Sequence, residues 1–308
     1  MAATNDRTVT VFGGTGFLGR HVVRRLRALE RPVRIASRHA PASRPEAVAW
    51  LRADIGSDEA VAAAVAGAYA VVNAVGLYAE DGAATFRSVH VEAAERLAHQ
   101  AHRAGVERLV HLSGIGAEAA SASRYIRSRG AGERAVAAAF ADAIIVRPAV
   151  MFGREDALIT TLVGLLQRLP AVPMFGRGRT RLQPVHVEDV AEAIARMLQP
   201  GAARAVTYEL AGPRIYTYAE LLAVVAARLA RRPALLPMPF PLWHVLARIG
   251  EMLPGSPLQR SQVELMEVDT VACGALPGFD ALGMVPQSFE RTLEAIVADA
   301  HGGRHGAG

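Results

Sequence analysis

The sequence predicts an α/β protein whose core is a Rossmann-type, doubly wound parallel sheet, followed by a smaller, mainly helical C-terminal domain. Short β-rich segments alternate with helical ones from Thr8 to Arg147, as in a parallel sheet with crossover helices. A glycine-rich turn follows the first β-rich segment. After Gly153 this regularity ends and Pro and Gly become frequent. The fold prediction depends on these three observations.

Two domains are predicted within the 308 residues. Residues 1–155 are expected to form the Rossmann domain and 156–300 the C-terminal domain, of which about 180–212 is expected to pack back on the Rossmann domain. The tail at 301–308 has no periodicity and no bulky side chain, so we expect it to be flexible.

Each predicted element has its own pattern. Six β-rich segments are predicted to be strands, at 8–12, 33–37, 48–53, 70–75, 108–113 and 143–148. Helices are predicted between them and beyond, at 17–29, 57–66, 85–104, 122–140, 155–168, 187–198, 217–231, 240–252 and 288–299.

Two apolar segments have an alternative interpretation as membrane contacts. The uncharged run from Ala60 to Ala79 is long enough to cross a bilayer, but it changes from alanine-rich to β-branched residues, which favours a buried helix and a buried strand. The 240–252 helix has apolar residues along one side, which favours a core face over a face that binds lipid or a partner. These residues are Phe240, Trp243, Leu246 and Ile249.

Composition narrows the functional classes. Hydrophobic residues make up 51% and charged residues 20%, which excludes a disordered chain. The one cysteine, Cys273, excludes a disulfide framework and a cysteine-rich metal site, and we expect no metal. No secretory signal is visible, so we expect a cytoplasmic protein with at most peripheral contact at the inner face of the cytoplasmic membrane. All 34 basic residues are arginine, and because they are scattered we expect no nucleic-acid partner.

The glycine-rich turn is the strongest functional signal. Glycines suit a tight turn and the close approach of backbone to a pyrophosphate, whose charge the following helix N-terminus binds. This position predicts dinucleotide binding rather than a purely structural loop. The residues expected to contact the cofactor here are Gly13, Thr15, Gly16, Phe17, Leu18 and Gly19.

The end of the second strand predicts which dinucleotide is bound. An acid there would bind the ribose hydroxyls of NAD(H), but the strand ends in Ser37 and Arg38. Arg38 suits a 2′-phosphate, with Arg20 as a second cation, so NADP(H) is favoured over NAD(H). The alternative is that Arg38 is simply a solvated arginine.

Further candidates follow the third and fourth strands. Asp54 is a candidate adenine contact, and Asn73, Ala74 and Val75 end the fourth strand beside the expected cofactor. Carboxyl ends of parallel strands carry the ligand site in doubly wound folds. Asp54 and Asn73 have the alternative role of cap or turn residues.

At this point the chain resembles the extended and atypical short-chain dehydrogenase/reductases of the NAD-dependent epimerase/dehydratase type, and within them the NAD(P)H-binding accessory subunit of respiratory complex I and its bacterial relatives. The matching segments are GGTGFLG, HLSGIGA, SRYIRSRGAGERAV, IIVRPAVMFGRED, RLQPVHVEDVAEAI and YELAGPRIYTYAELL. They cover nearly the whole chain in the expected order.

The resemblance implies a catalytic Tyr-x-x-x-Lys pair and a serine after the fifth strand. Tyr125 matches the tyrosine, but Arg129 stands in place of lysine. Ser113 ends the strand, whereas the catalytic serine position falls at Gly114. Three roles stay open for Tyr125: a helix-surface residue, a cofactor-facing residue with little turnover, or an active acid/base. The resemblance also implies that Arg147 and Pro148 lie near the nicotinamide.

Three functions remain open from the sequence alone. The first is an NADP(H)-binding accessory or assembly factor of a membrane redox complex with weak or no turnover. The second is an active NAD(P)-dependent oxidoreductase or epimerase acting on a lipid-like or nucleotide-linked substrate. The third is an NADPH-sensing regulator that binds a protein partner. No residue pattern names a substrate.

Overall fold

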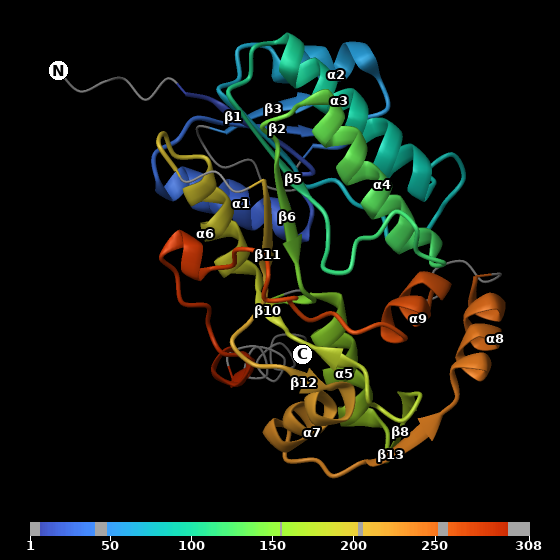
Figure 1. The fold of residues 1–308 in the computed structure, drawn as a ribbon. Helices are drawn as coiled ribbons and strands as arrows, with labels where there is room; N and C mark the ends of the chain where they lie inside the picture. Colours follow the sequence, from blue (N-terminus) through green and yellow to red (C-terminus); the bar gives the residue numbers. More distant parts are fainter. Residues whose placement is uncertain (1–6, 41–47, 155, 203–205, 252–257, 295–308) are drawn as a thin grey trace, which may run out of the picture. The chain divides into compact units, whose positions relative to one another are not determined.

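The structure is a computed structural model that describes residues 7–40, 48–154, 156–202, 206–251 and 258–294. It forms two compact units, and Figure 1 shows the elements of each. The first unit comprises Met1–Pro148, Glu188–Leu210 and Gly274–Met284, and the second comprises Ala149–Val187, Ala211–Cys273 and Val285–Gly308. The chain therefore passes between the units several times. The prediction included one such return, at about 180–212, and Glu188–Leu210 belongs to the first unit. The tail at 301–308 lies outside the described residues.

A seven-stranded parallel sheet is the centre of the first unit, which confirms the doubly wound fold. The strands run in the order β11-β6-β5-β4-β1-β2-β3. Their bounds are Val9–Phe12 for β1, Val33–Ser37 for β2, Val48–Arg52 for β3, Ala70–Asn73 for β4, Arg108–Leu112 for β5, Ile144–Pro148 for β6 and Thr207–Leu210 for β11. The order reverses between β1 and β4, where doubly wound folds bind their ligands.

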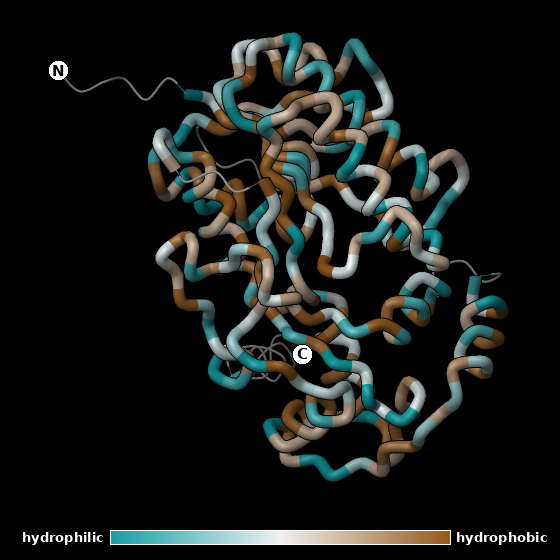
Figure 2. Tube along the Cα trace, in the orientation of Figure 1, coloured by the Kyte–Doolittle hydropathy of each residue, from teal (hydrophilic) through white to brown (hydrophobic). Residues whose placement is uncertain are grey.

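Helices cover both faces of this sheet (Figure 1). On one face lie α2 (Asp58–Val65), α3 (Ala93–Arg103) and α4 (Arg124–Ala139), which bury alanines and valines against the strands. On the other face lie α1 (Phe17–Ala28) and α6 (Val187–Met197), joined by the ion pair between Arg25 and Glu192. Figure 2 shows apolar residues concentrated along the central strands. The sheet is therefore buried on both sides, as continuous apolar strands require.

The second unit is built from helices and short strand pairs. Its helices are α5 (Ala157–Arg168), α7 (Tyr218–Arg228), α8 (Phe240–Gly250) and α9 (Arg260–Met266). Its strands pair as β7 (Met151–Phe152) with β10 (Val185–His186), β8 (Ala171–Phe175) with β13 (Ala234–Met238), and β9 (Arg181–Leu182) with β12 (Tyr216–Thr217). The ring of Phe289 packs on Phe152 and Tyr216 in its core, with centroids 5.0 and 5.7 Å away.

The structure contains several elements that were not predicted. In the second unit these are α9 and the strands β7, β8, β9, β10, β12 and β13. Strand β11 was not predicted, because its four residues become a strand only by pairing with β6. The predicted helix at 85–104 begins instead as the π-helix η1 (Arg87–Glu92) and continues as α3. The π-helix places His90 where both of its ring nitrogens are hydrogen-bonded, which a helical periodicity does not reveal. Beyond residue 294, the predicted 288–299 helix lies outside the described residues.

The apolar run from Ala60 to Ala79 is divided between α2 and β4, as the change in its composition predicts. Among the described residues, no helix has both the length and the apolar character needed to span a membrane.

The predicted core face of the 240–252 helix is only partly correct. Trp243 is half-buried and its indole Nε1 donates to Met174 O over 3.3 Å, but Leu246 and Ile249 are exposed. The apolar periodicity of this helix predicted one buried face, and the structure shows apolar residues on its outer face as well.

Candidate functional site

The glycine-rich turn connects β1 to α1, and its backbone packs so closely on neighbouring backbone that there is no room for side chains at Gly13 and Gly19. Gly13 has a φ of +72°, and a Cβ atom there would lie 2.8 Å from Ala74 O. A Cβ atom on Gly19 would lie 2.0 Å from Gly13 O. Helix α1 begins at Phe17, and its N-cap, Gly16, makes no side-chain capping hydrogen bond. The turn therefore brings bare backbone to the carboxyl edge of the sheet and leaves amide groups of the helix N-terminus available to an anion.

The other residues of this turn divide by burial. Thr15 and Gly16 are exposed, Phe17 is half-buried, and Leu18 is buried against the sheet. Arg20 lies over the Phe17 ring, with 5.5 Å between its guanidinium carbon and the ring centroid. Leu18 thus anchors α1, while the exposed part of the turn is the part that a ligand can reach.

Two arginines lie at the end of β2, and its described continuation, residues 38–40, contains no acid. The indole Nε1 of Trp50 donates to Ser37 Oγ over 3.0 Å, and that hydroxyl donates to His39 O over 2.6 Å. Arg38 is exposed. Ser37 pairs in register with Arg52, which is also exposed and ends β3. Arg52 was not predicted from the sequence, because only the strand register places it beside Ser37.

Asp54 forms a turn in the loop after β3. Its Oδ1 accepts from Gly56 N over 2.8 Å, and its carbonyl oxygen accepts from Ser57 N over 3.0 Å. Ser57 in turn caps α2, accepting from Ala60 N. This geometry supports the turn role that the sequence left open for Asp54, and contact with an adenine stays a prediction.

Asn73 organises the end of β4. Its side chain is buried, its Nδ2 lies 3.1 Å from Nδ1 of His111 on β5, and its Oδ1 accepts from Val75 N over 3.2 Å. Burial, and then the positive charge of Arg129, lowers the pKa of His111 to about 3, so its neutral Nδ1 accepts from the amide. The Asn73 side chain is therefore used within the protein, while the backbone of Ala74 and Val75 borders the glycine turn.

Tyr125 and Arg129 form a buried pair on α4. Arg129 Nη2 donates to Tyr125 Oη over 3.3 Å, and Nη1 donates to Leu112 O at the end of β5 over 3.1 Å. A Cβ atom on Gly76 would lie only 2.8 Å from Arg129 Nη2. The guanidinium thus lies between the ends of β4 and β5. Both side chains are buried, so Tyr125 is not the helix-surface residue that remained one of its three interpretations.

Aromatic rings fix the Tyr125 ring in place. Phe86 and His90 pack edge-on to it, each 5.5 Å away between centroids, and the exposed Tyr78 stacks on it at 5.8 Å. Such ring pairs are stabilising beyond the apolar area they bury. The orientation of the phenol is therefore set by the protein.

His90 supports this pair and was missed in the sequence. Its Nδ1 lies 2.8 Å from Ser128 Oγ, which donates to Tyr125 O, and its Nε2 accepts from Leu77 N over 3.0 Å. Burial, and then the charge of Arg129, lowers the pKa of His90 to about 2. His90 is thus a neutral imidazole that holds η1 on α4. No periodic or motif signal distinguishes it from the exposed His99.

Two neighbouring positions after β5 differ in what they can contribute. Ser113 is buried, and among the described residues its Oγ has no hydrogen-bond partner. The same is true of Arg129 Nε. Apart from the adjacent residues 113 and 115, a Cβ atom on Gly114 would meet nothing within 4 Å. Buried donors without a partner are groups that a polar ligand would satisfy, and Gly114 itself has no hydroxyl to offer such a ligand.

Arg147 has an internal role that the sequence did not predict. Its Nε and Nη2 donate to the two carboxylate oxygens of Glu133 over 2.9 and 2.6 Å, and Glu209 lies 3.8 Å from its Nη1. This bidentate pair joins β6 to α4. Pro148 O accepts from Ile115 N over 3.1 Å. Contact of Arg147 or Pro148 with a nicotinamide stays a prediction.

The family model for the NAD dependent epimerase/dehydratase family matches residues 9–211. The chain belongs to this family. It is 30% identical over 314 aligned residues, 96% of this chain and 78% of the relative, to the mitochondrial NADH dehydrogenase [ubiquinone] 1 alpha subcomplex subunit 9 of Arabidopsis thaliana. The subunit of the same name from Rattus norvegicus is 32% identical, over 93% of this chain and 79% of its own. A ceramide reductase of Caulobacter vibrioides is 31% identical, over 78% of this chain and 76% of its own.

Solved structures of other proteins show the same fold. A UDP-glucose 4-epimerase of Thermus thermophilus, solved with NAD, superposes with a TM-score of 0.71 at 21% identity, over 96% of this chain and 99% of that one. A dTDP-glucose 4,6-dehydratase of Streptomyces venezuelae, also solved with NAD, gives 0.73 at 22% identity, over 97% and 98%. At these identities the likeness establishes the architecture alone.

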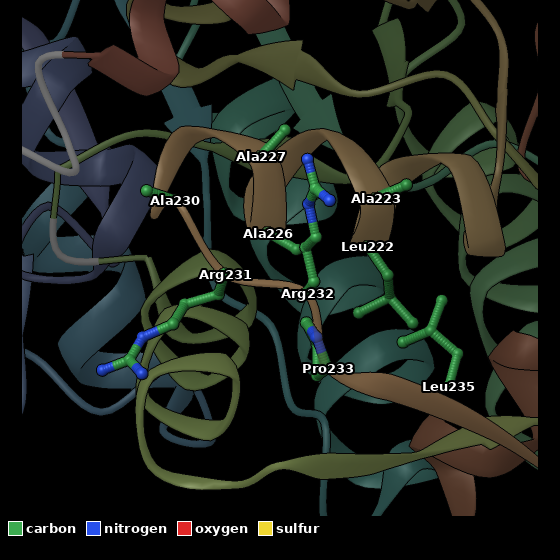
Figure 3. Close-up of a pocket in the computed structure, with 9 residues that line it drawn as sticks. All are labelled: Leu222, Ala223, Ala226, Ala227, Ala230, Arg231, Arg232, Pro233 and Leu235. Atoms are coloured by element: carbon green, nitrogen blue, oxygen red, sulfur yellow. The ribbon is translucent and has the colours of Figure 1, made fainter.

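A hollow in the second unit is lined by residues that cannot act as an acid, a base or a nucleophile. It lies between the end of α7 and β13 and is lined by Leu222, Ala223, Ala226, Ala227, Ala230, Arg231, Arg232, Pro233 and Leu235 (Figure 3). None of these residues has a carboxylate, hydroxyl, imidazole or thiol. Within the described part of the chain, no three His, Cys, Asp or Glu residues gather as metal ligands.

Proposed function

We propose that the chain is an NADP(H)-binding accessory or assembly factor of a membrane redox complex, with weak or no turnover of its own. The observation that carries this proposal is the contrast within one site. The glycine turn has the close backbone approach that a dinucleotide needs, whereas the positions for catalysis hold Arg129 and Gly114.

The residues present fit a nicotinamide dinucleotide. The amides at the start of α1 would hold the pyrophosphate, and Ser113 Oγ and Arg129 Nε are buried donors that lack a partner in the protein. When bound, the nicotinamide supplies hydride chemistry. Arg38 and Arg52 at the ends of β2 and β3 support a preference for the 2′-phosphate of NADP(H), because two exposed guanidinium groups lie there and neither Ser37 nor Arg38 is an acid.

The partner proposal has its support in the relatives. Subunits of mitochondrial NADH dehydrogenase from a plant and a rodent align with nearly the whole chain. We expect this chain to bind a respiratory complex from the cytoplasmic side of the membrane. The nucleotide would then act as a structural ligand, since a ligand that binds only the folded state stabilises it.

A second candidate function is an active oxidoreductase on a lipid-like carbonyl or alcohol. The ceramide reductase relative favours it, and so does the buried Tyr125–Arg129 pair. In that reaction Tyr125 would give its phenolic proton to the substrate oxygen, and the adjacent guanidinium would stabilise the resulting phenolate. The missing hydroxyl at Gly114 counts against rapid turnover, because one positioned donor often contributes a hundredfold or so in rate.

Affinity purification of the chain from gently solubilised membranes of its host separates the two functions. The accessory role predicts that subunits of a respiratory complex co-purify, and that Tyr125→Phe leaves this association unchanged. The chain purified free of any complex, together with reductase activity that Tyr125→Phe abolishes, would contradict the accessory role and favour the enzyme.

A further inference from the structure

Helix α8 exposes a stripe of large apolar side chains. Leu242, Val245, Leu246 and Ile249 follow one another at helical spacing and are 46%, 54%, 40% and 54% exposed. The opposite side of the same helix is also apolar, because Trp243 packs on β8 and Ala247 is fully buried. Its polar side chains are those of His244 and Arg248. His244 and Arg248 are four residues apart and share one face, so the rest of the circumference of α8 is apolar, which is wider than the single stripe by which a surface helix usually packs on its own protein.

One more large apolar side chain is exposed in β13, the strand that precedes α8 in the sequence. Leu236 of β13 is 52% exposed. We name the stripe together with this leucine the α8 surface, and it consists of Leu236, Leu242, Val245, Leu246 and Ile249. Isolated exposed apolar residues are common, but a contiguous set at one helical spacing marks an interaction site.

The charge of this segment identifies the kind of partner. Residues 231–251 include Arg231, Arg232 and Arg248 and one acid, Glu251, which gives a formal charge of +2. All three arginines are exposed. Figure 3 shows Arg231 and Arg232 at the turn that leads into β13, with Arg231 directed away from Leu222 and Leu235. Exposed apolar residues flanked by cations suit a surface whose outer layer is anionic and whose interior is apolar.

We propose that the α8 surface binds an anionic phospholipid bilayer, with α8 lying in the plane of the headgroups. Its 11 residues reach about 16 Å, which is only about half of a hydrocarbon core, so α8 lies on the membrane and does not span it. Pairing of two copies through this face is disfavoured, because it would bring two positive segments together. The proposal does not depend on the nucleotide site.

Sedimentation of the full chain with vesicles tests this proposal. One set of vesicles contains phosphatidylcholine mixed with phosphatidylglycerol, and the other contains phosphatidylcholine alone. We expect binding to the mixed vesicles that weakens as salt is raised, and much weaker binding to phosphatidylcholine. The double variant Val245→Gln with Ile249→Gln should weaken binding to the mixed vesicles about tenfold or more, since it removes two apolar anchors.

A matched control removes the same two residue types elsewhere in the same unit. Ile215 and Val285 are 45% and 92% exposed, so Ile215→Gln with Val285→Gln should bind as the unchanged chain does. Thermal melting checks that both double variants fold. Equal vesicle binding by the two double variants would overturn the proposal. The proposal would also be overturned if the unchanged chain did not bind vesicles but self-associated, and if Val245→Gln with Ile249→Gln made it monomeric. That result would show that the α8 surface binds a second copy of the chain.

Discussion

Arg129 and Gly114 occupy positions where the family resemblance implies a lysine and a serine. The first replacement keeps the functional group that the position needs, and the second does not. Arg129 is held by Leu112 O and Tyr125 Oη, so the exchange of lysine for arginine keeps a buried positive charge beside the phenol. Gly114 leaves open space and no donor. A chain without lysine accounts for Arg129 but not for Gly114. The missing hydroxyl at Gly114 is therefore the stronger argument against rapid turnover.

The variant Arg38→Ala tests whether the chain prefers NADPH to NADH. NADPH should bind at least tenfold more tightly than NADH, a difference of about 1.4 kcal/mol. Arg38→Ala should remove most of this difference, because it removes a guanidinium that can pair with the 2′-phosphate. Titration calorimetry with both nucleotides measures the two affinities, with Arg103→Ala as the control, since Arg103 ends α3 just before β5 begins. Equal affinity of the unchanged chain for NADPH and NADH would contradict the prediction.

His90 and His111 predict how stability depends on pH. Burial is the main cause that lowers their pKa values, to about 2 and about 3, so both stay neutral in the folded chain while the unfolded chain takes up protons below about pH 6.5. The unfolded state then binds more protons, and the free energy of unfolding falls as the pH drops. Between pH 7 and 5 the loss should be about 2 kcal/mol for each histidine.

Urea unfolding across this pH range measures the slope. His111→Asn should reduce the slope, whereas His99→Asn should leave it unchanged, because His99 is exposed. A slope that is the same in all three chains would show that burial of His111 is not its source.

The glycine turn could be located from the sequence because it is a local pattern, whereas the switch in strand order between β1 and β4 depends on long-range pairing and was not predicted. A strand, a glycine-rich turn and a helix follow one another within residues 9–28, and the alternation of strands predicts their parallel order. Strand β11, the π-helix η1 and the position of Arg52 could not be located in this way. Each depends on pairing or packing with residues distant in the sequence: β6 for β11, Ser128 for His90 in η1, and β2 for Arg52.

Gly19→Ala tests the packing of α1 on the turn. Its Cβ atom would lie 2.0 Å from Gly13 O, a backbone atom that cannot move aside without shifting the turn. We expect a lower melting temperature and loss of nucleotide binding, measured by differential scanning fluorimetry and calorimetry. Gly164→Ala in α5 is the matched control, because its Cβ atom would meet only Arg168 Nη1, at an ordinary contact distance of 3.8 Å, so it should neither lower the melting temperature nor weaken nucleotide binding. An unchanged affinity in Gly19→Ala would show that the close approach is not required for binding.

The chain as a whole combines a dinucleotide fold with a weakened catalytic centre and an apolar outer helix. A dinucleotide fold by itself could also belong to an enzyme. An exposed apolar helix by itself could also form a protein interface. Together the three features fit a protein whose folded state is stabilised by a nucleotide and whose second unit binds a membrane. This combination is why we propose a structural role for the nucleotide, with turnover secondary.

Nucleotide binding and turnover, measured on one preparation, show whether the nucleotide has a structural or a catalytic role in this protein. NADPH at about a hundredfold above its Kd should stabilise the fold by about 2.7 kcal/mol and clearly raise the melting temperature. Hydride transfer from NADPH to a broad panel of carbonyl compounds, including lipid ketones, should stay near background. Arg129→Lys alone should not restore turnover, whereas Arg129→Lys with Gly114→Ser supplies both missing groups and should raise it. Rapid turnover by the unchanged chain, abolished in Tyr125→Phe, would contradict the structural role.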